Sequence, residues 1–277
     1  MKTSMGMLRR AIICGIAVIL GAASAHAQTR VPAVKPFSEL VVFGDSLSDT
    51  GNAGRFTDGA VWVEVLARRL DLDLRASSAG GSNYAVGGAR SHGGATDIRG
   101  QLRRYLDSSA KPLDPEVLFV VWGGANDLLA AGCAPGRDAA TTAAAAMRAS
   151  VDELAAAGAR TVIVANLPDV GHAPIVRAQG PACTQTARRL TGEFNMALER
   201  GMRDVEARRG VRILLLDVFG LAERVIADPS AAGLRDGSDR CPPGACDGAL
   251  FADALHPSAD AHAIIAEAAL RELAAPD

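Results

Sequence analysis

The sequence predicts a three-layer α/β/α sandwich built on a parallel sheet of about five strands. Four apolar runs have the length of a strand and are continuously apolar rather than alternating, which is typical of strands covered on both faces: residues 39–43, 116–122, 160–166 and 211–219. Stretches of helix length separate these runs. Strands that alternate with helices favour parallel pairing through right-handed crossovers, so we expect helices on both faces of the sheet.

The connecting stretches carry their own evidence for helices. Amphipathic patterns predict helices at residues 60–70, 97–106, 139–158, 186–210 and 260–274. The third of these is rich in alanine, the best helix former. A weaker strand, LDLRAS, is expected at residues 72–77. The chain has no internal repeat and no linker rich in Pro, Ser or Gly, so residues 28–277 are expected to form a single domain.

The first 27 residues differ in composition from the rest of the chain. A basic start that includes Lys2, Arg9 and Arg10 precedes an apolar run of about a dozen residues, and small residues close the segment. This pattern predicts a secretory signal peptide at residues 1–27. A membrane anchor is the alternative, but a bilayer crossing needs about 20 apolar residues. We therefore expect secretion without a stable membrane anchor.

The charge of the chain argues against nucleic acid as a partner. The sequence has 29 basic and 31 acidic residues, and removal of residues 1–27 takes away three basic residues and no acidic one. A net acidic domain would repel a phosphate backbone, so we expect no nucleic acid partner.

The cysteines of the mature chain favour two disulfides. Their number is even, and the expected compartment is oxidising. Three pairings are possible, of which we favour Cys241 with Cys246, which closes the short loop CPPGAC, and Cys133 with Cys183, which lie in predicted loops. A zinc site is the alternative, but no histidine lies near either pair at the spacing of zinc ligands.

Polar residues gather where the first predicted strand ends. Residues 44–49, sequence GDSLSD, follow this strand, and ligand sites of open α/β sheets lie beyond the carboxyl ends of their strands. A reactive serine needs a base, a group that orients the base, and donors for an oxyanion. His256 has a carboxylate, Asp253, three residues before it. We therefore consider Ser46, His256 and Asp253 as nucleophile, base and orienting group.

Two further motifs offer donors for an oxyanion. NYAVGGA contains Gly87 and Gly88, where the missing Cβ lets a backbone N–H approach a bound atom. GGAND follows the strand predicted at 116–122 and contains Asn126, whose side-chain amide can donate. Each motif taken singly is also explained by a turn, by backbone freedom or by a helix cap.

Together the motifs resemble the SGNH, or GDSL, hydrolase family, which is named for a serine, a glycine, an asparagine and a histidine in separate sequence blocks. FGDSLSDTGN, NYAVGGA, GGAND and DALHP match these blocks in the family order, and GAVWVEVLA and NLPDVGHAP extend the resemblance over nearly all of the mature chain. It is closest to the secreted bacterial branch that includes the passenger domains of autotransporter esterases and some acyltransferase-like phospholipases. Only 21 residues follow His256, so the autotransporter barrel is not expected. The serine lies in G-D-S-L-S rather than G-x-S-x-G, so the nucleophile elbow of α/β-hydrolases is not expected either.

The resemblance implies a role for each candidate residue. The implied triad is Ser46, His256 and Asp253, and the implied oxyanion hole combines the backbone N–H of Ser46, the backbone N–H of Gly88 and the amide of Asn126. Gly87 stays open as an alternative to Gly88.

The implied activity is hydrolysis of carboxylic esters through an acyl-enzyme, without a metal or other cofactor, on a small-molecule or lipid ester. We favour a lipolytic esterase or lysophospholipase, secreted to the periplasm or the medium of a bacterium. A polysaccharide O-acetylesterase, an acyltransferase and a non-catalytic binding protein are the alternatives.

Overall fold

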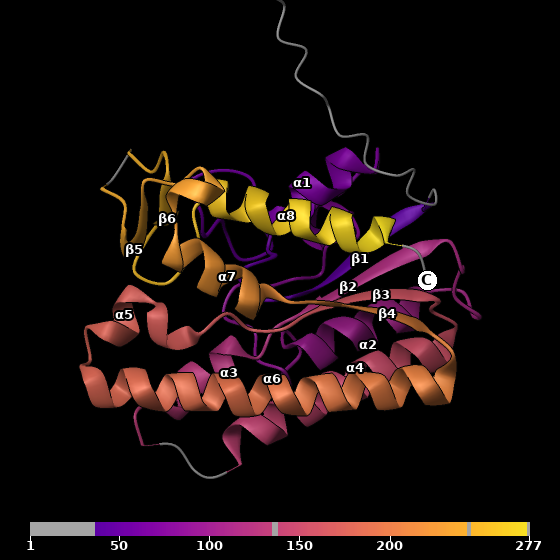
Figure 1. Cartoon of the computed structure of the whole chain (residues 1–277). Helices are drawn as coiled ribbons and strands as arrows, with labels where there is room; N and C mark the ends of the chain where they lie inside the picture. Colours follow the sequence, from indigo (N-terminus) through magenta and orange to yellow (C-terminus); the bar gives the residue numbers. More distant parts are fainter. Residues whose placement is uncertain (1–36, 135–137, 243–244, 276–277) are drawn as a thin grey trace, which may run out of the picture. The chain divides into compact units, whose positions relative to one another are not determined.

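A parallel sheet of four strands lies at the centre of the fold (Figure 1). The computed structural model describes residues 37–134, 138–242 and 245–275, so the predicted signal peptide lies outside it. The strands follow one another in the order β1 (Glu39–Gly44), β2 (Val117–Trp122), β3 (Thr161–Ala165) and β4 (Arg212–Leu216). All three pairings are parallel. Every residue of β2 is buried, because the strand is covered on both faces, as its continuous apolar run predicts.

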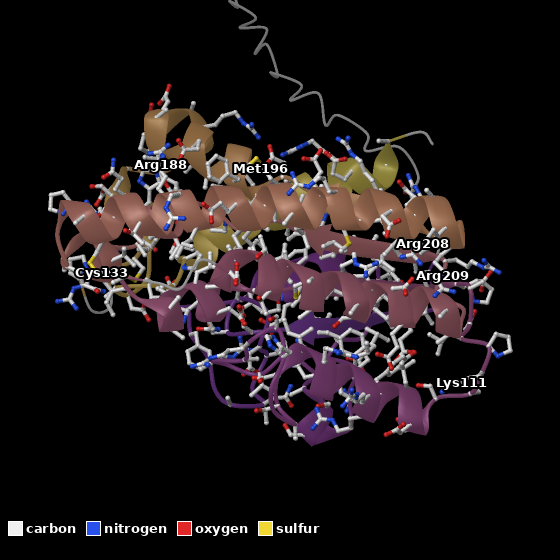
Figure 2. The ribbon with its side chains drawn as sticks, turned by 90° about the horizontal axis from the view of Figure 1, so that it is seen from below. Lys111, Cys133, Arg188, Met196, Arg208 and Arg209 are labelled. Atoms are coloured by element: carbon white, nitrogen blue, oxygen red, sulfur yellow. A yellow bond between two sulfur atoms is a disulfide. The ribbon has the colours of Figure 1, made fainter. Side chains whose placement is uncertain are left out.

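Helices cover both faces of the sheet, which confirms the predicted three-layer fold. One layer consists of α1 (Trp62–Arg69) and α8 (Ala259–Ala274), and the other of α2 (Ile98–Ser108), α3 (Ala125–Ala131), α4 (Ala139–Ala157) and α6 (Pro181–Arg209). Helices α4 and α6 pack along each other, and Arg208 and Arg209 at the end of α6 both reach Asp152 of α4 (Figure 2). None of the described helices is both long and apolar enough to cross a membrane.

The end of the sheet that carries the site is covered by shorter elements. These are the helices α5 (Pro174–Arg177) and α7 (Val218–Ala227), the 3-10 turns η1 (Ser77–Ala79), η2 (Val170–His172) and η3 (Ser230–Ala232), and a small parallel pair of strands, β5 (Asp236–Arg240) and β6 (Ala249–Phe251). Val225 of α7 and Leu250 of β6 belong to a second apolar cluster, separate from the main core. The run predicted as a strand over residues 211–219 ends earlier, because Asp217 caps α7 by accepting from the N–H of Gly220.

The prediction of a strand at residues 72–77 is wrong. Only Ala76 forms an isolated bridge there, to Asn83. The alternation of charged and apolar residues in LDLRAS leaves it half exposed, whereas residues 82–86 lie against β1. Val42 of β1 accepts from the N–H of Tyr84 at 2.8 Å, and its own N–H donates to Ser82 at 3.1 Å. The segment 82–86 therefore takes the edge position of the missing strand.

The connections place a crevice at the end of β1. The chain leaves β1, forms the segment 82–86 on one side of it, and then crosses to β2 on the other side. Loops that leave a parallel sheet in opposite directions from one position open a crevice beyond the carboxyl ends of its strands. Asp45 and Ser46 follow β1 at this point.

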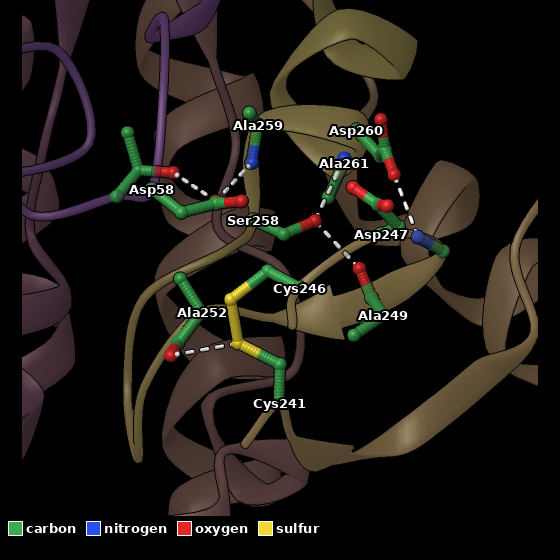
Figure 3. Close-up of a disulfide and its surroundings, with 12 residues drawn as sticks. Asp58, Cys241, Cys246, Asp247, Ala249, Ala252, Ser258, Ala259, Asp260 and Ala261 are labelled. Atoms are coloured by element: carbon green, nitrogen blue, oxygen red, sulfur yellow. Dashed lines mark hydrogen bonds between the residues drawn. A yellow bond between two sulfur atoms is a disulfide. The ribbon is translucent and has the colours of Figure 1, made fainter. Parts of the chain in front are cut away.

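The four cysteines among the described residues form two disulfides. Cys133, which follows α3, is bonded to Cys183 in the first turn of α6, with their Cα atoms 4.6 Å apart (Figure 2). Cys241 is bonded to Cys246 beside β6 and the start of α8, with their Cα atoms 4.8 Å apart (Figure 3). These are the pairs that we favour from the sequence, and they use the thiols that a zinc site would need.

Candidate active site

The turn after β1 is held by a buried glutamine. Gln101 of α2 is fully buried, and its side chain accepts from the N–H of Gly44 at 2.9 Å and donates to the carbonyl of Gly44 at 2.8 Å. Asp45 continues the turn by accepting from the N–H of Leu47 at 3.0 Å. Sheet pairing ends at Gly44, so the glutamine satisfies the buried N–H of Gly44 and adds a second donor to its carbonyl, which also accepts from the N–H of Val86 at 3.1 Å. It fixes the direction in which Ser46 leaves the strand.

Ser46, His256 and Asp253 form a continuous chain of hydrogen bonds. The Oγ of Ser46 lies 3.0 Å from Nε2 of His256, and Nδ1 of His256 lies 2.7 Å from Oδ2 of Asp253. An ionised carboxylate can only accept, so Nδ1 carries the proton and Nε2 is left to accept from the serine. The serine is 7% exposed. The three residues suggested by the sequence therefore meet, although 210 positions separate Ser46 from His256.

The loop that carries the histidine is built around the carboxylate of Asp253. Its Oδ1 accepts from the backbone N–H groups of Leu255 and His256, both at 2.7 Å. Burial would raise the pKa of the Asp253 carboxyl, but the hydrogen bonds from the backbone and ring of His256 and from Leu255 hold it below its ordinary value. The group stays ionised and can stabilise an imidazolium at His256.

Ser258 anchors this loop to the last helix (Figure 3). Its Oγ accepts from the N–H of Ala261, which caps α8, and donates to the carbonyl of Ala249 in β6 at 2.5 Å. The N–H of Ala259 donates to Asp58 at 2.8 Å, which adds a contact with the loop before α1. The position of His256 is thus set by three separate parts of the chain.

The two adjacent glycines have different surroundings. The N–H of Gly87 donates to Oδ2 of Asp49 at 2.8 Å, and a Cβ on Gly87 would lie 2.2 Å from the ring of Phe56. Gly88 has a φ of +79°, and a Cβ there would meet nothing within 4 Å. Within the described residues, the backbone N–H groups of Gly88 and Ser46 have no acceptor. Of the two glycines, Gly88 therefore keeps a backbone N–H that can donate to a bound atom, whereas the N–H of Gly87 is taken by Asp49.

Asp49 organises the loops on both sides of the site. It is fully buried, and it accepts four backbone N–H groups, those of Gly51, Asn52, Ala53 and Gly87. These bonds tie the loop after β1 to the loop that carries Gly88. A carboxylate that is saturated by amides in this way has a structural explanation and needs no metal ion.

Asn126 lies in the first turn of α3, beside Ser46. Its Nδ2 donates to the carbonyl of Ala89 at 3.0 Å and lies 3.5 Å from Oδ2 of Asp45. The next residue, Asp127, accepts from the N–H and the hydroxyl of Ser91, both at 2.8 Å. The motif GGAND is therefore bound to the loop that follows Gly88. One amide N–H of Asn126 is engaged with Ala89, and the other has only the long contact with Asp45.

Asp45 is a buried carboxyl group next to the candidate nucleophile. It is 1% exposed, and burial, aided by the nearby charge of Asp127, raises the pKa of Asp45 to about 7 despite the hydrogen bond from Leu47. At neutral pH it is therefore only partly ionised. This limits the negative charge that a developing oxyanion at Ser46 would meet.

An apolar cavity of about 100 Å³ adjoins Ser46 and His256. Its walls come from α3, the segment around η2, α7, β6 and the loop of the histidine. Apolar side chains make up most of its lining: Leu47, Ala125, Leu129, Pro168, Val170, Ala173, Ala222, Ile226, Leu250, Phe251, Leu255 and Pro257. A cavity of this composition can take an apolar group attached to an ester carbonyl.

A second polar cluster lies at this cavity, and we did not assign it from the sequence. Asp169, His172 and Glu223 offer ligand atoms within 4.8 Å of one another, as a metal site would. Arg188, however, lies 3.5 Å from Asp169 and 3.2 Å from Glu223, so its guanidinium already balances both carboxylates. Asp169 and His172 have the same three-residue spacing as Asp253 and His256, and this spacing is the signal that could have revealed them.

Comparisons with known proteins relate the chain to a group of hydrolases. A family model described as GDSL-like Lipase/Acylhydrolase matches residues 40–269. Lipase 1 of Photorhabdus luminescens is 34% identical over 175 residues, covering 57% of this chain and 27% of the lipase. The phosphatidylcholine-sterol acyltransferase of Aeromonas hydrophila is 28% identical over 226 residues, covering 74% of this chain and 65% of that protein. The chain thus spans less than two thirds of the length of either relative.

A solved structure shares the arrangement of the main chain. Axe2, an acetylxylan esterase from Geobacillus stearothermophilus, superposes with a TM-score of 0.52 and 19% sequence identity, over 85% of this chain and 93% of that one. The likeness at this identity concerns the fold.

Proposed function

We propose that this chain, which belongs to the GDSL-like lipase/acylhydrolase family, is a carboxylic ester hydrolase, namely a secreted lipolytic esterase or lysophospholipase with Ser46 as its nucleophile. The observation that carries this proposal is the hydrogen-bonded chain from Ser46 through His256 to Asp253 at the wall of an apolar cavity.

The first half of the reaction forms an acyl-enzyme. The Oγ of Ser46 attacks the ester carbonyl carbon while its proton passes to Nε2 of His256. The imidazolium that forms is stabilised by Asp253, 2.7 Å from Nδ1. The tetrahedral intermediate then releases the alcohol, which takes the proton from His256.

The second half regenerates the serine. A water molecule gives a proton to Nε2 of His256 and attacks the acyl carbon, and the second tetrahedral intermediate releases the carboxylic acid as Ser46 regains its proton. His256 passes each proton between Ser46 and the alcohol or water, and no step changes an oxidation state.

The oxyanion would be held by donors from two loops and from the first turn of α3. We assign them to the N–H of Ser46, the N–H of Gly88 and the amide of Asn126. The support is that the first two have no acceptor within the described residues, and that Asn126 lines the same cavity as Ser46. For Asn126 to take this role, its Nδ2 group must donate a hydrogen bond to the oxyanion in place of a contact that it now makes with Ala89 or Asp45. Such a donor acts mainly in the transition state.

The cavity supports a lipolytic substrate. A sugar ester would need donors and acceptors for its hydroxyl groups, whereas the walls here are mainly alkyl and aromatic side chains. A panel of p-nitrophenyl esters of increasing chain length, assayed beside acetylxylan and a lysophospholipid, tests this. We expect activity on the longer nitrophenyl esters or the lysophospholipid. Turnover confined to acetylxylan would assign the chain to polysaccharide deacetylation, and no labelling of Ser46 by a fluorophosphonate would assign it to binding without catalysis.

Secretion is part of the proposal. The basic and apolar composition of residues 1–27 supports it, as do the two disulfides, which persist in oxidising compartments. Mass spectrometry of the protein recovered from a bacterial periplasm or medium should show Gln28 as the first residue. A chain recovered there with Met1 intact would contradict cleavage.

A further inference from the structure

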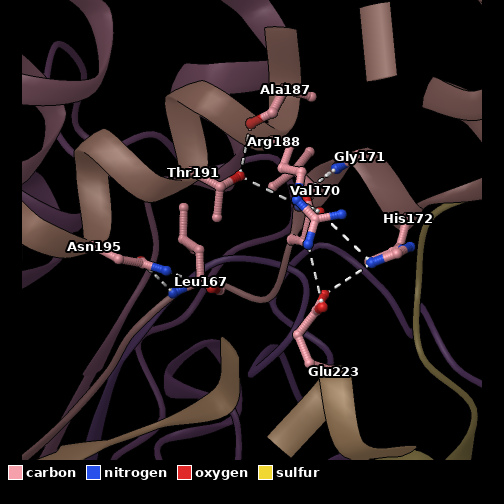
Figure 4. A network of polar contacts seen from close by, with 10 residues as sticks. Leu167, Val170, Gly171, His172, Ala187, Arg188, Thr191, Asn195 and Glu223 are labelled. Atoms are coloured by element: carbon pink, nitrogen blue, oxygen red, sulfur yellow. Dashed lines mark hydrogen bonds and ion pairs between the residues drawn. The ribbon is translucent and has the colours of Figure 1, made fainter. Parts of the chain in front are cut away.

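A network of charged side chains joins two walls of the apolar cavity (Figure 4). Glu223 of α7 lies 2.8 Å from Nε2 of His172 and accepts from the guanidinium of Arg188 at 3.2 Å. Asp169 completes the network, 3.5 Å from Arg188 and 3.6 Å from His172. Asp169 and His172 line the cavity, whereas Glu223 and Arg188 do not.

The wall around η2 is fixed by its own hydrogen bonds to α6 (Figure 4). Asn195 accepts from the N–H of Leu167 at 2.9 Å and donates to its carbonyl at 2.8 Å. The hydroxyl of Thr191 accepts from the N–H of Val170 at 3.3 Å. This wall does not depend on Glu223 for its position, because these contacts reach its backbone directly.

The wall formed by α7 is held differently. Ala222 and Ile226 contribute its lining, and the helix is fixed at its start, where Asn166 accepts from the N–H of Phe219 at 2.8 Å. Val218 and Leu221 pack in the main core, whereas Val225 and Ile226, further along the helix, pack in the second apolar cluster. Between these two anchors, the carboxylate of Glu223 connects the middle of α7 to the fixed wall around η2.

We propose that Glu223 is a specificity-determining residue, whose links to His172 and Arg188 hold α7 against the η2 segment and so limit the length of the acyl group that the cavity accepts. This inference rests on the proposed ester hydrolysis at Ser46. The acid side of the substrate occupies the cavity, and Glu223 links the α7 wall of this cavity to the η2 wall.

The direction of the effect follows from the contacts. If the carboxylate is removed, α7 loses its links to His172 and Arg188, and the cavity can extend between Ala222 and His172. Each methylene group of the acyl chain that moves from water into apolar surroundings raises kcat/KM for the longer ester by about fourfold. The opposite change, a larger side chain at Ala222, fills the cavity and favours shorter substrates.

The experiment compares four variants with the unmodified protein. Glu223→Ala removes both links, and Arg188→Met removes the guanidinium that pairs with Glu223 and Asp169, at a position that does not itself line the cavity. Ala222→Leu narrows the cavity. Glu193→Ala is the matched control, because Glu193 is another helical glutamate paired with an arginine, and its side chain is 34% exposed against 35% for Glu223.

The measured quantity is the ratio of kcat/KM for p-nitrophenyl dodecanoate to kcat/KM for p-nitrophenyl butyrate. We expect this ratio to rise at least about fourfold in Glu223→Ala, to rise in Arg188→Met and to fall in Ala222→Leu, with no change in Glu193→Ala. Thermal unfolding of each variant checks that it is folded. If Glu223→Ala cannot be obtained folded, Arg188→Met and Ala222→Leu decide the question by the same ratio.

The outcomes separate this inference from the proposed function. An active enzyme whose ratio is the same in Glu223→Ala, Arg188→Met and Glu193→Ala overturns the role of Glu223 and leaves ester hydrolysis intact. A protein that hydrolyses neither ester, while Ser46 does not react with a fluorophosphonate, overturns the proposed function and this inference with it.

Discussion

The carboxyl group of Asp45 provides a quantitative test of the electrostatics beside Ser46. It is 1% exposed, and burial raises the pKa of Asp45 from 3.8 to about 7. A pKa that is higher in the folded than in the unfolded state means that the folded protein binds the proton more tightly. The stability contributed by this group is therefore complete below the unfolded-state pKa of 3.8 and is lost as the pH rises to the folded-state value of about 7.

The size of the effect follows from the two pKa values. They differ by about three units, and each unit corresponds to 1.36 kcal/mol, so ionisation of Asp45 lowers the free energy of unfolding by about 4 kcal/mol. In Asp45→Asn the side chain cannot ionise, and its carbonyl oxygen can still accept from the N–H of Leu47. The stability of the variant relative to the unmodified protein should thus increase by about 4 kcal/mol between about pH 4 and pH 8.

Urea unfolding at half-unit steps of pH, with the disulfides intact, measures this difference. Other groups titrate in both proteins and cancel in the comparison. The difference should change most between about pH 4 and pH 7 and stay constant above about pH 8. A difference that is flat over the whole range, or one that falls as the pH rises, would refute the assignment of a buried and partly protonated carboxyl group beside the nucleophile.

Four further outcomes are expected. Ser46→Ala should leave less than about a thousandth of the ester hydrolysis with little change in thermal midpoint, and higher residual turnover would indicate another nucleophile. Asp253→Asn should lower kcat, but less than Ser46→Ala does, because the amide disfavours the productive tautomer of His256; equal kcat would show that another group orients the ring. Asn126→Ala should lower kcat by about a hundredfold to a thousandfold with KM little changed, whereas a destabilised variant with normal kcat would remove Asn126 from the oxyanion hole. Replacing Cys133 and Cys183 by serine should lower the free energy of unfolding by about 4 kcal/mol, measured with denaturant, because their separation of 50 residues closes a long loop; an unchanged value would show that the bond is not formed in solution.

The sequence by itself determined the layers of the fold and pointed to the three residues of the proposed triad. Continuous apolar runs predict buried parallel strands because both faces of such strands are covered, and β1 to β4 lie where these runs lie. Asp253 and His256 are three residues apart, so their contact is local and can be read from spacing. Ser46 follows the first strand directly, and its place at the carboxyl end of the sheet follows from the topology.

Only the tertiary structure shows which groups surround the proposed triad. The choice between Gly87 and Gly88 depends on Asp49, 38 positions before Gly87, which takes one of the two N–H groups. Residues 82–86, and not residues 72–77, occupy the edge position beside β1. Which of two segments packs against a strand depends on the assembled fold, and the hydropathy pattern of a single segment does not contain that information.

The cavity and the network at its wall are likewise products of long-range packing. Glu223 meets His172 across 51 positions of the chain, and the pKa of Asp45 is raised by the burial that several packed elements impose. Periodicity and local motifs report the contacts of a residue with its neighbours in sequence. Burial, and the electrostatic effects that follow from it, depend on elements that come together only when the whole sheet and its helices have assembled.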